Sequence, residues 1–404
     1  MAARDFDLVL WGATGFTGRL AAEHLTTHYG HGGPLRWALG GRNRDKLEAL
    51  AATLADDSGT PPLVTGDSGD EASMAALAAR TNVICSTVGP YARHGTPLVA
   101  ACADNGTHYC DLTGEVPWVA MTIARFGERA AETGARIVHS CGFDSIPSDL
   151  GTWFVQREML TRHGVAGRHV RGRVGRTRGG ASGGTVASLL GVMEEAGRDR
   201  AVRKLLADPY SLNPPGAPRG PDRDDSLRPL YDPVFKQWTG PFVMAAINTR
   251  VVRRSNALLD YPWGEDFAYD ERQLCRSRAQ AVLLAGALGG GMAAMALGPT
   301  RRLAAHFLPA PGEGPDAEER ENGFFELFLH AEHPEDRALD LRARVSGDRD
   351  PGYGATSRML GEAAASLALD DLPSGGGIWT PATAFGEALL SRLRDRAGLS
   401  FDIV

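Results

Sequence analysis

Short apolar runs alternate with longer segments of helical periodicity through roughly the first 145 residues. An unbroken run such as residues 83–88 is typical of a strand that is buried on both faces of a parallel sheet, whereas apolar positions that recur every three to four residues are typical of a helix packed on it. Strands are expected to begin near residues 8, 35, 62, 83, 108 and 136. Because strands and helices alternate, we predict an α/β fold with a doubly wound parallel sheet and right-handed crossovers.

The pattern changes after about residue 148. Residues 169–178 alternate between basic and small or apolar side chains, which is typical of a half-exposed antiparallel strand. We interpret its basic side as solvated, with a docking face for an acidic carrier protein as the alternative. Further strands are predicted at residues 242–252, 324–329 and 343–345, so this part is expected to be a second, α+β domain with a mixed or antiparallel sheet.

Two segments of this second part are unusual. Residues 208–233 hold seven prolines and many charges, so we expect a flap over a site or a disordered surface loop. Residues 279–299 carry no charge, are rich in alanine and contain five glycines. Their length suits a membrane span, but glycine weakens a helix, so a contact with the bilayer surface and the wall of an apolar pocket or an oligomer contact are alternatives. Each interpretation implies a lipophilic partner.

The first strand, residues 8–11, runs directly into three glycines at three-residue spacing. Gly12 would allow the tight turn from strand to helix, Gly15 would let the backbone approach a pyrophosphate, and Gly18 would let the helix pack close to the strand. The helix N-terminus that follows favours negative charge. Such spacing is common, and the strand–turn–helix context is what indicates a dinucleotide site. The predicted contacts from this turn are Gly12, Thr14, Gly15, Phe16, Thr17 and Gly18.

The second strand ends at residues 40–41 without the acidic residue that usually binds the ribose 2′-hydroxyl of NAD. Arg42 and Arg44, with Lys46 beside them, offer positive charge suited to a 2′-phosphate, so NADP(H) is the expected cofactor. The alternative is that these cations only line the solvated first turn of a helix. Asp67, after the third strand, is expected near the adenine. The loop after the fourth strand is expected to complete the cofactor site with Thr87, Val88 and Gly89.

The chain has 404 residues, a formal charge of −6, 43% apolar residues and 23% charged residues. That length suits two domains, and the acidic balance gives nucleic-acid binding little electrostatic support. The five cysteines form no C-x-x-C pair, which favours a reducing compartment. The N-terminus enters the first strand almost at once, without the features of a secretion signal. We expect a cytoplasmic protein, with membrane association through residues 279–299 as an open alternative.

Eight short motifs stand in order along the chain, at residues 12–18, 40–42, 88–91, 110–115, 141–149, 182–185, 350–353 and 380–382. Together they resemble the saccharopine dehydrogenase-like oxidoreductases, and within them the branch that includes the trans-acting enoyl reductases of mycobacterial polyketide lipid synthesis. The resemblance covers nearly the whole chain. It implies an NADP-binding Rossmann domain over residues 1–147 and an α+β domain for substrate or oligomer contacts over residues 148–349. Residues 350–404, with amphipathic helices predicted at 353–369 and 382–397, would return to the Rossmann domain.

The resemblance implies an NADPH-dependent reductase that delivers hydride to the β-carbon of an α,β-unsaturated acyl chain, either a small molecule or a chain bound to an acyl carrier. Hydride addition creates an enolate, so the site needs hydrogen-bond donors and an acid that protonates the α-carbon. Tyr91 is a candidate donor, Asp144 is a candidate acid if burial raises its pKa, and Ser145 or Thr113 could orient the carbonyl. The structural alternative is that Tyr91 packs a turn and that Asp144, like Asp111, caps backbone groups.

Two other functions stay open. A saccharopine-type imine or amino-acid dehydrogenase would use the same cofactor, but we find no clear set of charges that would clamp an amino-dicarboxylate, whereas apolar surface is plentiful. A dinucleotide-binding sensor without catalysis would share the fold, because a fold does not fix the chemistry. Turnover of an enoyl thioester, of a keto acid with an amine, or of neither would separate the three. A homo-oligomer is also compatible with the sequence.

Overall fold

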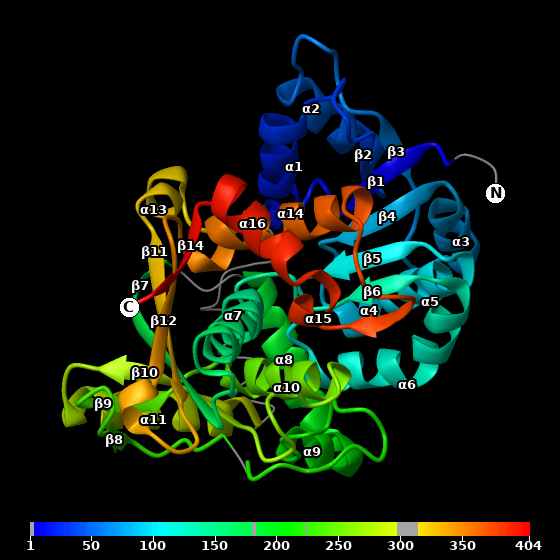
Figure 1. Ribbon diagram of the computed structural model, residues 1–404. Helices are drawn as coiled ribbons and strands as arrows, with labels where there is room; N and C mark the ends of the chain where they lie inside the picture. The colour runs from blue at the N-terminus through cyan, green and yellow to red at the C-terminus, as the bar shows by residue number, and fades with distance from the viewer. Residues whose placement is uncertain (1–3, 180–182, 224, 297–313) are drawn as a thin grey trace.

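Two seven-stranded sheets stand side by side in the protein, a parallel sheet with helices on both faces and a mixed sheet (Figure 1). The computed structural model describes residues 4–179, 183–223, 225–296 and 314–404. The first sheet is the doubly wound layer that the sequence predicts, and the second contains both antiparallel and parallel strand pairs. The expected fold class is therefore confirmed.

The parallel sheet has the strand order β13-β6-β5-β4-β1-β2-β3. Successive residues of β1 point to opposite faces, so that Leu8 and Leu10 join one core while Val9 and Trp11 join the other. All four side chains are at most 1% exposed, which is why the apolar run is unbroken. The strands are β1 (Phe6–Trp11), β2 (Trp37–Gly41), β3 (Leu63–Thr65), β4 (Thr81–Ser86), β5 (His108–Asp111), β6 (Arg136–Val138) and β13 (Gly377–Trp379).

Helices cover both faces of the parallel sheet. Side-chain caps fix where two of them begin, because Asn43 accepts a hydrogen bond from the backbone N–H of Lys46 and Asp70 accepts one from that of Ala72. The core of one face holds α1 (Phe16–Tyr29), α2 (Arg44–Thr53) and α14 (Thr356–Leu369), and the core of the other holds α3 (Glu71–Ala79), α4 (Tyr91–His94), α5 (Thr96–Asn105) and α6 (Val116–Thr133).

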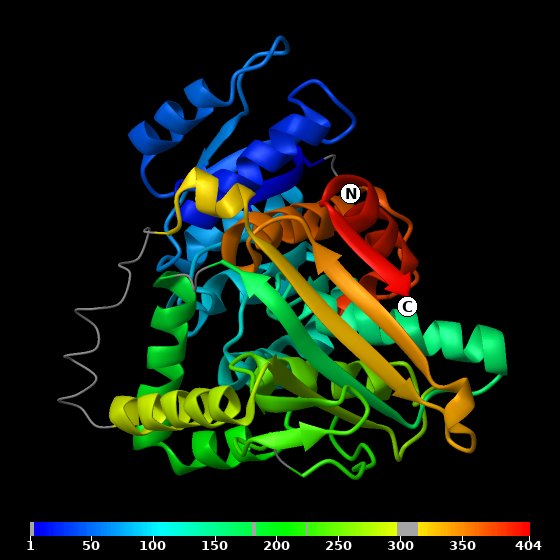
Figure 2. The same ribbon diagram turned by 90° about the vertical axis from the view of Figure 1, so that its left-hand side faces the viewer.

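The mixed sheet has the strand order β14-β12-β11-β7-β10-β9-β8, and Figure 2 shows its first four strands side by side. All neighbours pair antiparallel except β7 and β10. Two helices, α7 (Ile146–His163) and α10 (Ala245–Leu258), lie between the two sheets. The strands are β7 (His169–Arg178), β8 (Leu230–Asp232), β9 (Gln237–Pro241), β10 (Ala268–Cys275), β11 (Phe324–Glu332), β12 (Leu341–Gly347) and β14 (Leu399–Ile403). The strands predicted at residues 324–329 and 343–345 are thus confirmed.

The prediction of a strand at residues 242–252 is wrong, because most of this segment lies in α10. The helix is enclosed by α7, the mixed sheet and the proline-rich segment, and even its arginines Arg250, Arg253 and Arg254 are at most 5% exposed. A helix without a solvated face lacks clear amphipathic spacing, so its short apolar runs resemble those of a buried strand.

The basic side of β7 is not solvated, contrary to the expectation. Arg173 is 2% exposed and forms ion pairs with Asp232 at 2.6 Å and Asp270 at 2.7 Å. Arg171 pairs with Glu332 at 2.6 Å. These acids come from β8, β10 and β11, so the pattern of β7 alone could not reveal them. Because the cations are neutralised internally, they leave little free charge for an acidic carrier protein.

The described part of the proline-rich segment, residues 208–223 and 225–233, is a packed loop that leads into β8. Arg250 and Arg253 of α10 donate hydrogen bonds to the backbone carbonyl oxygens of Asp208 and Pro209, each at 3.1 Å. These buried arginines therefore supply the hydrogen-bond donors that backbone carbonyl groups would otherwise find within a helix or a sheet. These contacts contradict the disordered alternative for the part of the loop that the structure describes.

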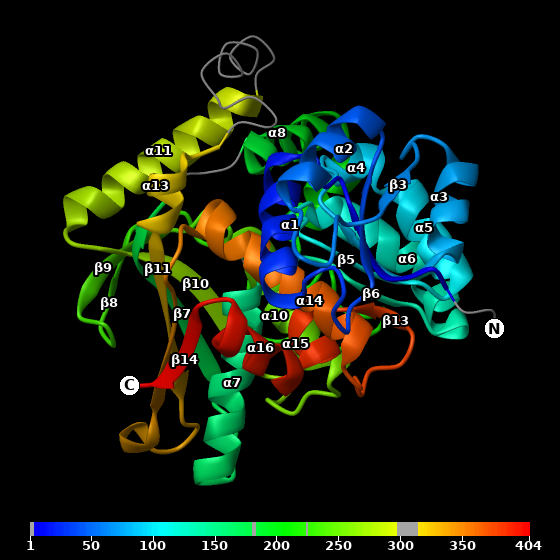
Figure 3. The same cartoon turned by 90° about the horizontal axis from the view of Figure 1, so that it is seen from above.

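The predicted apolar segment lies largely in α11 (Arg278–Ala296), which packs against β9 and α8 (Gly183–Arg198) (Figure 3). Ala281 is fully buried, whereas Leu283 is 73% exposed. Within the described ranges, no helix is long and apolar enough to cross a membrane. The end of the segment, residues 297–299, lies outside the described residues, and a bilayer-surface or oligomer contact stays a prediction.

The C-terminal part of the chain contributes to both sheets. β13 pairs with β6 at the edge of the parallel sheet, and β14 pairs with β12 at the edge of the mixed sheet. Helix α14 packs against α1 and against strands β1, β4 and β5 of the parallel sheet. The remaining elements are α9 (Arg200–Ala207), α13 (Ala317–Glu321), α15 (Pro381–Phe385), α16 (Glu387–Arg396), a 3₁₀ turn (Arg337–Leu339) and a π-helical turn (Pro351–Ala355).

Candidate functional site

The turn between β1 and α1 has no room for side chains at two of its glycines. Gly12 has φ +88°, and a Cβ there would lie 2.6 Å from Cγ2 of Val88. A Cβ on Gly18 would lie 2.8 Å from Cα of Ala13 and would overlap the Gly12 carbonyl oxygen. Thr87 donates a hydrogen bond from Oγ1 to that same oxygen at 3.0 Å, so the loop after β4 locks the turn. Glycine is required here because the backbone conformation and the space both exclude a side chain.

The N-terminus of α1 is open toward the edge of the sheet. Gly15 is the N-cap residue, and no side chain caps the helix. The first N–H groups of a helix have no acceptor within it, so they are available to an anion. Thr14 and Thr17 are partly exposed beside this N-terminus. The Phe16 ring instead packs edge-on against the Tyr353 ring, with 4.4 Å between the ring centroids. This contact joins the turn to the C-terminal part of the chain.

The cations after β2 differ in their partners. Arg42 is exposed, and its guanidinium has no hydrogen-bond or ion-pair partner among the residues that the structure describes. Arg44 pairs with Glu48 at 2.8 Å, one helical turn away. Asp67 is exposed beyond the neighbouring strand β3, and its carboxylate accepts a hydrogen bond from the N–H of Gly69 at 2.9 Å. Arg42, like the exposed Lys46, therefore has no ion-pair partner in the described part of the chain, whereas Arg44 has one.

Tyr91 lies two residues after the predicted cofactor residue Gly89, but it points into the protein. It is 3% exposed, and its hydroxyl donates a hydrogen bond to the carbonyl oxygen of Ser86 at 3.0 Å. Its ring stacks on Trp118, with 5.4 Å between centroids. Burial, with the nearby charge of Asp111, raises the pKa of Tyr91 well above its usual value. In this structure the Tyr91 hydroxyl has a structural role, because its hydrogen bond fixes the end of β4.

Glu115 has a role that sequence reasoning missed. It is 2% exposed, and its carboxylate accepts hydrogen bonds from the N–H groups of Tyr91 and Ala92, both at 2.9 Å. It also accepts one from the Ser188 hydroxyl at 2.7 Å. Glu115 thus joins the loops after β4 and β5 to α8. Its place in the motif at residues 110–115 was the available signal, but the motif does not show which groups meet it.

Asp111 caps backbone groups, as its structural alternative expected. The fully buried carboxylate accepts hydrogen bonds from the N–H groups of Thr113 at 3.0 Å and Ser140 at 3.1 Å, and it contacts Nδ1 of His139 at 2.8 Å. The other ring nitrogen of His139 contacts the Thr122 hydroxyl at 3.0 Å. This network fixes the carboxyl ends of β5 and β6, where the loops of the site begin.

Asp144 is different, because its carboxyl has no hydrogen-bond partner in the described part of the chain. It follows β6, and a Cβ on Gly114 would lie 3.8 Å from its Oδ2. The same Cβ would lie 3.5 Å from Cε of Met244 and 4.0 Å from Cγ2 of Ile247, so two apolar side chains border Gly114 as well. Burial raises the pKa of Asp144 to about 7. This meets the condition under which the carboxyl can act as an acid near neutral pH.

Ser145, the next residue, is fully buried and donates a hydrogen bond to Oδ1 of Asn248 at 3.2 Å. The backbone N–H of Phe143 donates to the Thr356 hydroxyl at 3.0 Å. The loop that carries Asp144 is therefore held on one side by α10 and on the other by α14. The structure brings the predicted cofactor residues and Asp144 to the carboxyl edge of one sheet, whereas Tyr91 and Ser145 lie beneath that edge.

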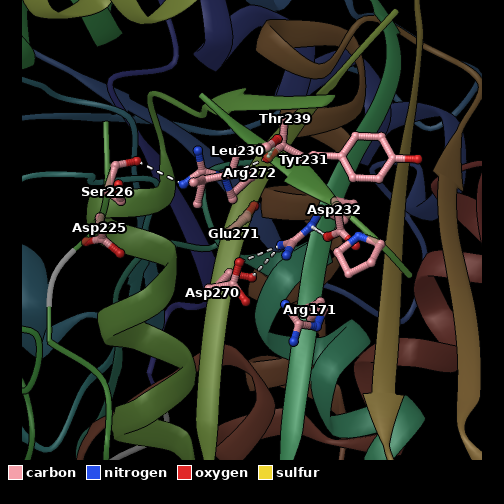
Figure 4. Close-up of a pocket in the computed structure, with 12 residues that line it drawn as sticks. Arg171, Asp225, Ser226, Leu230, Tyr231, Asp232, Thr239, Asp270, Glu271 and Arg272 are labelled. Atoms are coloured by element: carbon pink, nitrogen blue, oxygen red, sulfur yellow. Dashed lines mark hydrogen bonds and ion pairs between the residues drawn. The ribbon is translucent and has the colours of Figure 1, made fainter. Parts of the chain in front are cut away.

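A cavity of about 260 Å³ opens on the mixed sheet, and none of the predicted site residues lines it (Figure 4). Its arginines have partners within the protein. Arg173 pairs with Asp232 and Asp270, and Arg272 donates a hydrogen bond to the Ser226 carbonyl oxygen at 3.0 Å. Because the phosphate-binding features lie on the other sheet, we do not assign this cavity to the cofactor.

Comparisons with known proteins agree with this geometry. The family model described as saccharopine dehydrogenase NADP binding domain matches residues 8–138. A Mycobacterium tuberculosis protein provisionally named trans-acting enoyl reductase is 41% identical, over 98% of this chain and 97% of that protein. The trans-acting enoyl reductase of Mycobacterium bovis is 38% identical, over 97% of this chain and 96% of that protein.

Among solved structures, the apo saccharopine dehydrogenase (L-Glu forming) of Saccharomyces cerevisiae matches with a TM-score of 0.55 and 12% identity, over 99% of this chain and 100% of that chain. At this identity the match shows a shared fold. The family model and the relatives that match over nearly the full length show the family as well as the fold. The chain is an NAD(P)-dependent oxidoreductase with NADP(H) as its cofactor, and it belongs to the saccharopine dehydrogenase-like family, in the branch that holds the trans-acting enoyl reductases.

Proposed function

We propose that this protein reduces the carbon–carbon double bond of an α,β-unsaturated acyl chain that is presented as a thioester by an acyl carrier. NADPH supplies the hydride, which adds to the β-carbon, and the protein supplies a proton to the α-carbon. The names of the relatives support the reaction class. The observation that carries the proposal is the Asp144 carboxyl, which has a pKa of about 7, no partner in the described structure, and a position at the carboxyl edge of the sheet.

The residues at the edge fit a phosphorylated dinucleotide. The turn at Gly12 and Gly18 leaves backbone space, and the N-terminus of α1 at Gly15 offers N–H groups to the pyrophosphate. Arg42 would bind the 2′-phosphate, for which a guanidinium is well suited. Asp67 would lie near the adenine. The loop after β4 would line the nicotinamide side of the site with Thr87, Val88 and Gly89.

Asp144 would act as the acid. When half of the carboxyl is protonated near neutral pH, it can give its proton to the α-carbon as charge builds up on the substrate. The apolar surroundings that raise its pKa also exclude water from the reacting carbons. Tyr91 is a poorer candidate, since its hydroxyl is buried and already donates to the Ser86 carbonyl oxygen. The proposal therefore assigns the proton to Asp144.

The substrate class follows from the surface beside this acid. Val88, Leu112 and Met244 are partly buried apolar side chains at the edge, and they extend one of the two hydrophobic cores. Such a surface gains free energy by contact with a hydrocarbon chain and gives a charged amino-dicarboxylate no partner. An acyl chain is therefore the better fit.

The test is turnover by the purified protein. We expect oxidation of NADPH in the presence of a 2-enoyl thioester of an acyl carrier, with a saturated thioester as product by mass spectrometry. Parallel reactions contain a 2-oxo acid with an amino acid as amine donor. Turnover of that pair alone would replace the proposal by imine reduction. Binding of NADPH without turnover of either substrate would favour a sensor.

A further inference from the structure

A second buried acid lies beneath the loop of Asp144. Glu271 on β10 is 5% exposed, and no lysine, arginine or histidine of the described ranges forms an ion pair with it. Its carboxylate accepts hydrogen bonds from Ser148 at 3.0 Å, Asn248 at 3.2 Å and Tyr269 at 3.3 Å. Burial nevertheless raises the pKa of Glu271 to about 7. A buried carboxyl without a cation is costly, and such groups concentrate at functional sites.

The elements packed around Glu271 offer hydrogen bonds but no positive charge. Ser148 comes from α7 and Asn248 from α10. From β7, Gly172 lies against it, where a Cβ would be 3.3 Å from Cγ of Glu271, and the apolar Val174 lines the same small cavity. The charged group that acts on it is Asp225, which raises its pKa further. The hydrogen bonds from neutral donors are therefore what holds this carboxyl in place.

One of those donors leads to the site. The NH₂ group of Asn248 donates to the Glu271 carboxyl at 3.2 Å, an arrangement that the ionised form of Glu271 requires because it only accepts hydrogen bonds. The amide oxygen of Asn248 then faces the opposite way and accepts the hydrogen of the Ser145 hydroxyl at 3.2 Å. Glu271, together with the Ser148 hydroxyl that donates to it and accepts from the same NH₂ group at 3.2 Å, thus decides which end of the Asn248 amide meets Ser145.

We propose that Glu271 is a positioning residue, which acts through Asn248 on the Ser145 hydroxyl and thereby fixes the turn that presents Asp144. Ser145 is the N-cap residue of α7, with φ −151° and ψ −28°, but its hydroxyl caps no N–H group of that helix. The hydrogen bond to Asn248 is therefore the contact that holds the Ser145 hydroxyl in place. A small cavity of about 10 Å³ is lined by residues that include Phe143, Asn248 and Glu271, so the turn has space to shift if that bond is lost. The inference rests on the proposed role of Asp144.

The variants separate hydrogen-bond geometry from charge and from general stability. Glu271→Gln keeps a side-chain carbonyl acceptor for Asn248, whereas Glu271→Leu leaves it only the Ser148 hydroxyl. Asn248→Leu breaks the same connection one step closer to Ser145. Glu326→Leu, on another strand of the same sheet, is the matched control. For each full-length protein we would measure kcat and KM with the enoyl thioester, and the titration of Asp144 by carbon-13 NMR without substrate.

We expect Glu271→Leu and Asn248→Leu to lower kcat by about 100-fold, the effect of a small misplacement of a reacting group, with the KM for NADPH unchanged. Both should also shift the Asp144 titration, while Glu271→Gln and the control keep the wild-type values. Unchanged titration and kcat in the two leucine variants would overturn the inference, as would an equal loss in Glu271→Gln. The NMR titration needs no turnover, so it decides the inference even if enoyl reduction fails.

Discussion

At the scale of single residues, Asp144 and Arg42 are charged groups beside the predicted cofactor site that have no ion-pair partner in the described structure. Arg173, by contrast, pairs with two acids. Both unpaired groups follow strands of the parallel sheet, at the edge where ligands of such folds bind. We propose that both groups meet the cofactor or the substrate at that edge.

Substitution of Asp144 tests the proton donor. Asp144→Asn keeps the size of the side chain but removes its acidity, so we expect kcat to fall by about 100- to 10,000-fold. In the wild type the carboxyl must be protonated to donate, and its pKa is about 7, so kcat should be high at acidic pH and fall as the pH rises through that value. Steady-state NADPH oxidation as a function of pH measures both effects.

Asp104→Asn is the control for this substitution, because Asp104 is exposed and pairs with Arg129 on the outside of the parallel layer. Its kcat and pH profile should match those of the wild type. A wild-type rate that stays flat through neutral pH would contradict the role of Asp144.

Removal of the free guanidinium tests cofactor choice. Arg42→Ala deletes a charge-assisted contact to the 2′-phosphate, which corresponds to a roughly 10- to 100-fold weaker binding of NADPH. NADH lacks that phosphate, so its affinity should change little. Isothermal titration calorimetry with both nucleotides measures the difference, with Arg80→Ala, an exposed arginine paired with Asp5, as the control. An equal loss of affinity for the two nucleotides would contradict the assignment of Arg42 to the 2′-phosphate.

The sequence could locate these candidates but not their surroundings. Asp144, Tyr91 and Ser145 all follow strand ends, which a single sequence shows. Whether a side chain turns toward the edge or beneath it depends on neighbours far along the chain, such as Asn248 for Ser145. The contacts of the individual cofactor residues remain predictions.

At the scale of elements, the glycine turn depends on close approach of α1 to β1. In Gly18→Ala the new methyl group would collide with the Gly12 carbonyl, so we expect a loss of about 1–3 kcal/mol in unfolding free energy together with weaker NADPH binding. Gly127→Ala, inside α6, meets no atom within 4 Å and should instead gain about 0.5–1 kcal/mol. Urea unfolding of both variants measures the contrast. A similar effect in both would show that close packing at Gly18 is unimportant.

The elements were predictable wherever local chemistry decides them. The strands predicted to begin near residues 108 and 136 begin at His108 and Arg136, because both are short apolar runs that are buried after their first residue. Prediction failed where contacts between distant segments decide the secondary structure, as they do for α10. The parallel pairing of β7 with β10 likewise joins strands about a hundred residues apart, which no local pattern records.

At the scale of the whole molecule, a buried network joins the cofactor helix to the C-terminal part. Glu362 on α14 is fully buried and contacts His24 at 2.8 Å, Tyr29 at 2.7 Å and Arg392 at 3.5 Å. Burial opposes its ionisation, but these partners outweigh burial and lower the pKa of Glu362. The network fixes α1, and therefore the phosphate-binding turn, against α14 and α16.

Loss of this carboxylate should destabilise the protein. We expect Glu362→Ala to cost about 3–5 kcal/mol, since it leaves the buried partners unpaired. Glu387→Ala removes an exposed ion pair with Arg157 and should cost at most about 1 kcal/mol. Thermal unfolding followed by circular dichroism compares the two variants. Equal melting temperatures would contradict the structural importance of the network.

The long-range organisation could be predicted only through the family resemblance. Its motifs at residues 141–149 and 380–382 meet in space, where the Asp149 carboxylate accepts a hydrogen bond from the N–H of Ala382 at 2.8 Å. Periodicity alone predicts helices near the C-terminus but not the strands β13 and β14, which are short and take their positions from the sheets they join. The division of the chain at residues 147 and 349 remains a prediction.

Those two late strands bear on how the protein is made. A ribosome delivers residues 377–379 and 399–403 after every strand with which they pair, so β6 and β12 stay unprotected at their outer edges while translation continues. Open edges invite pairing with other chains. Nascent copies should therefore rely on chaperones until the last strands arrive, and separately expressed halves should tend to precipitate.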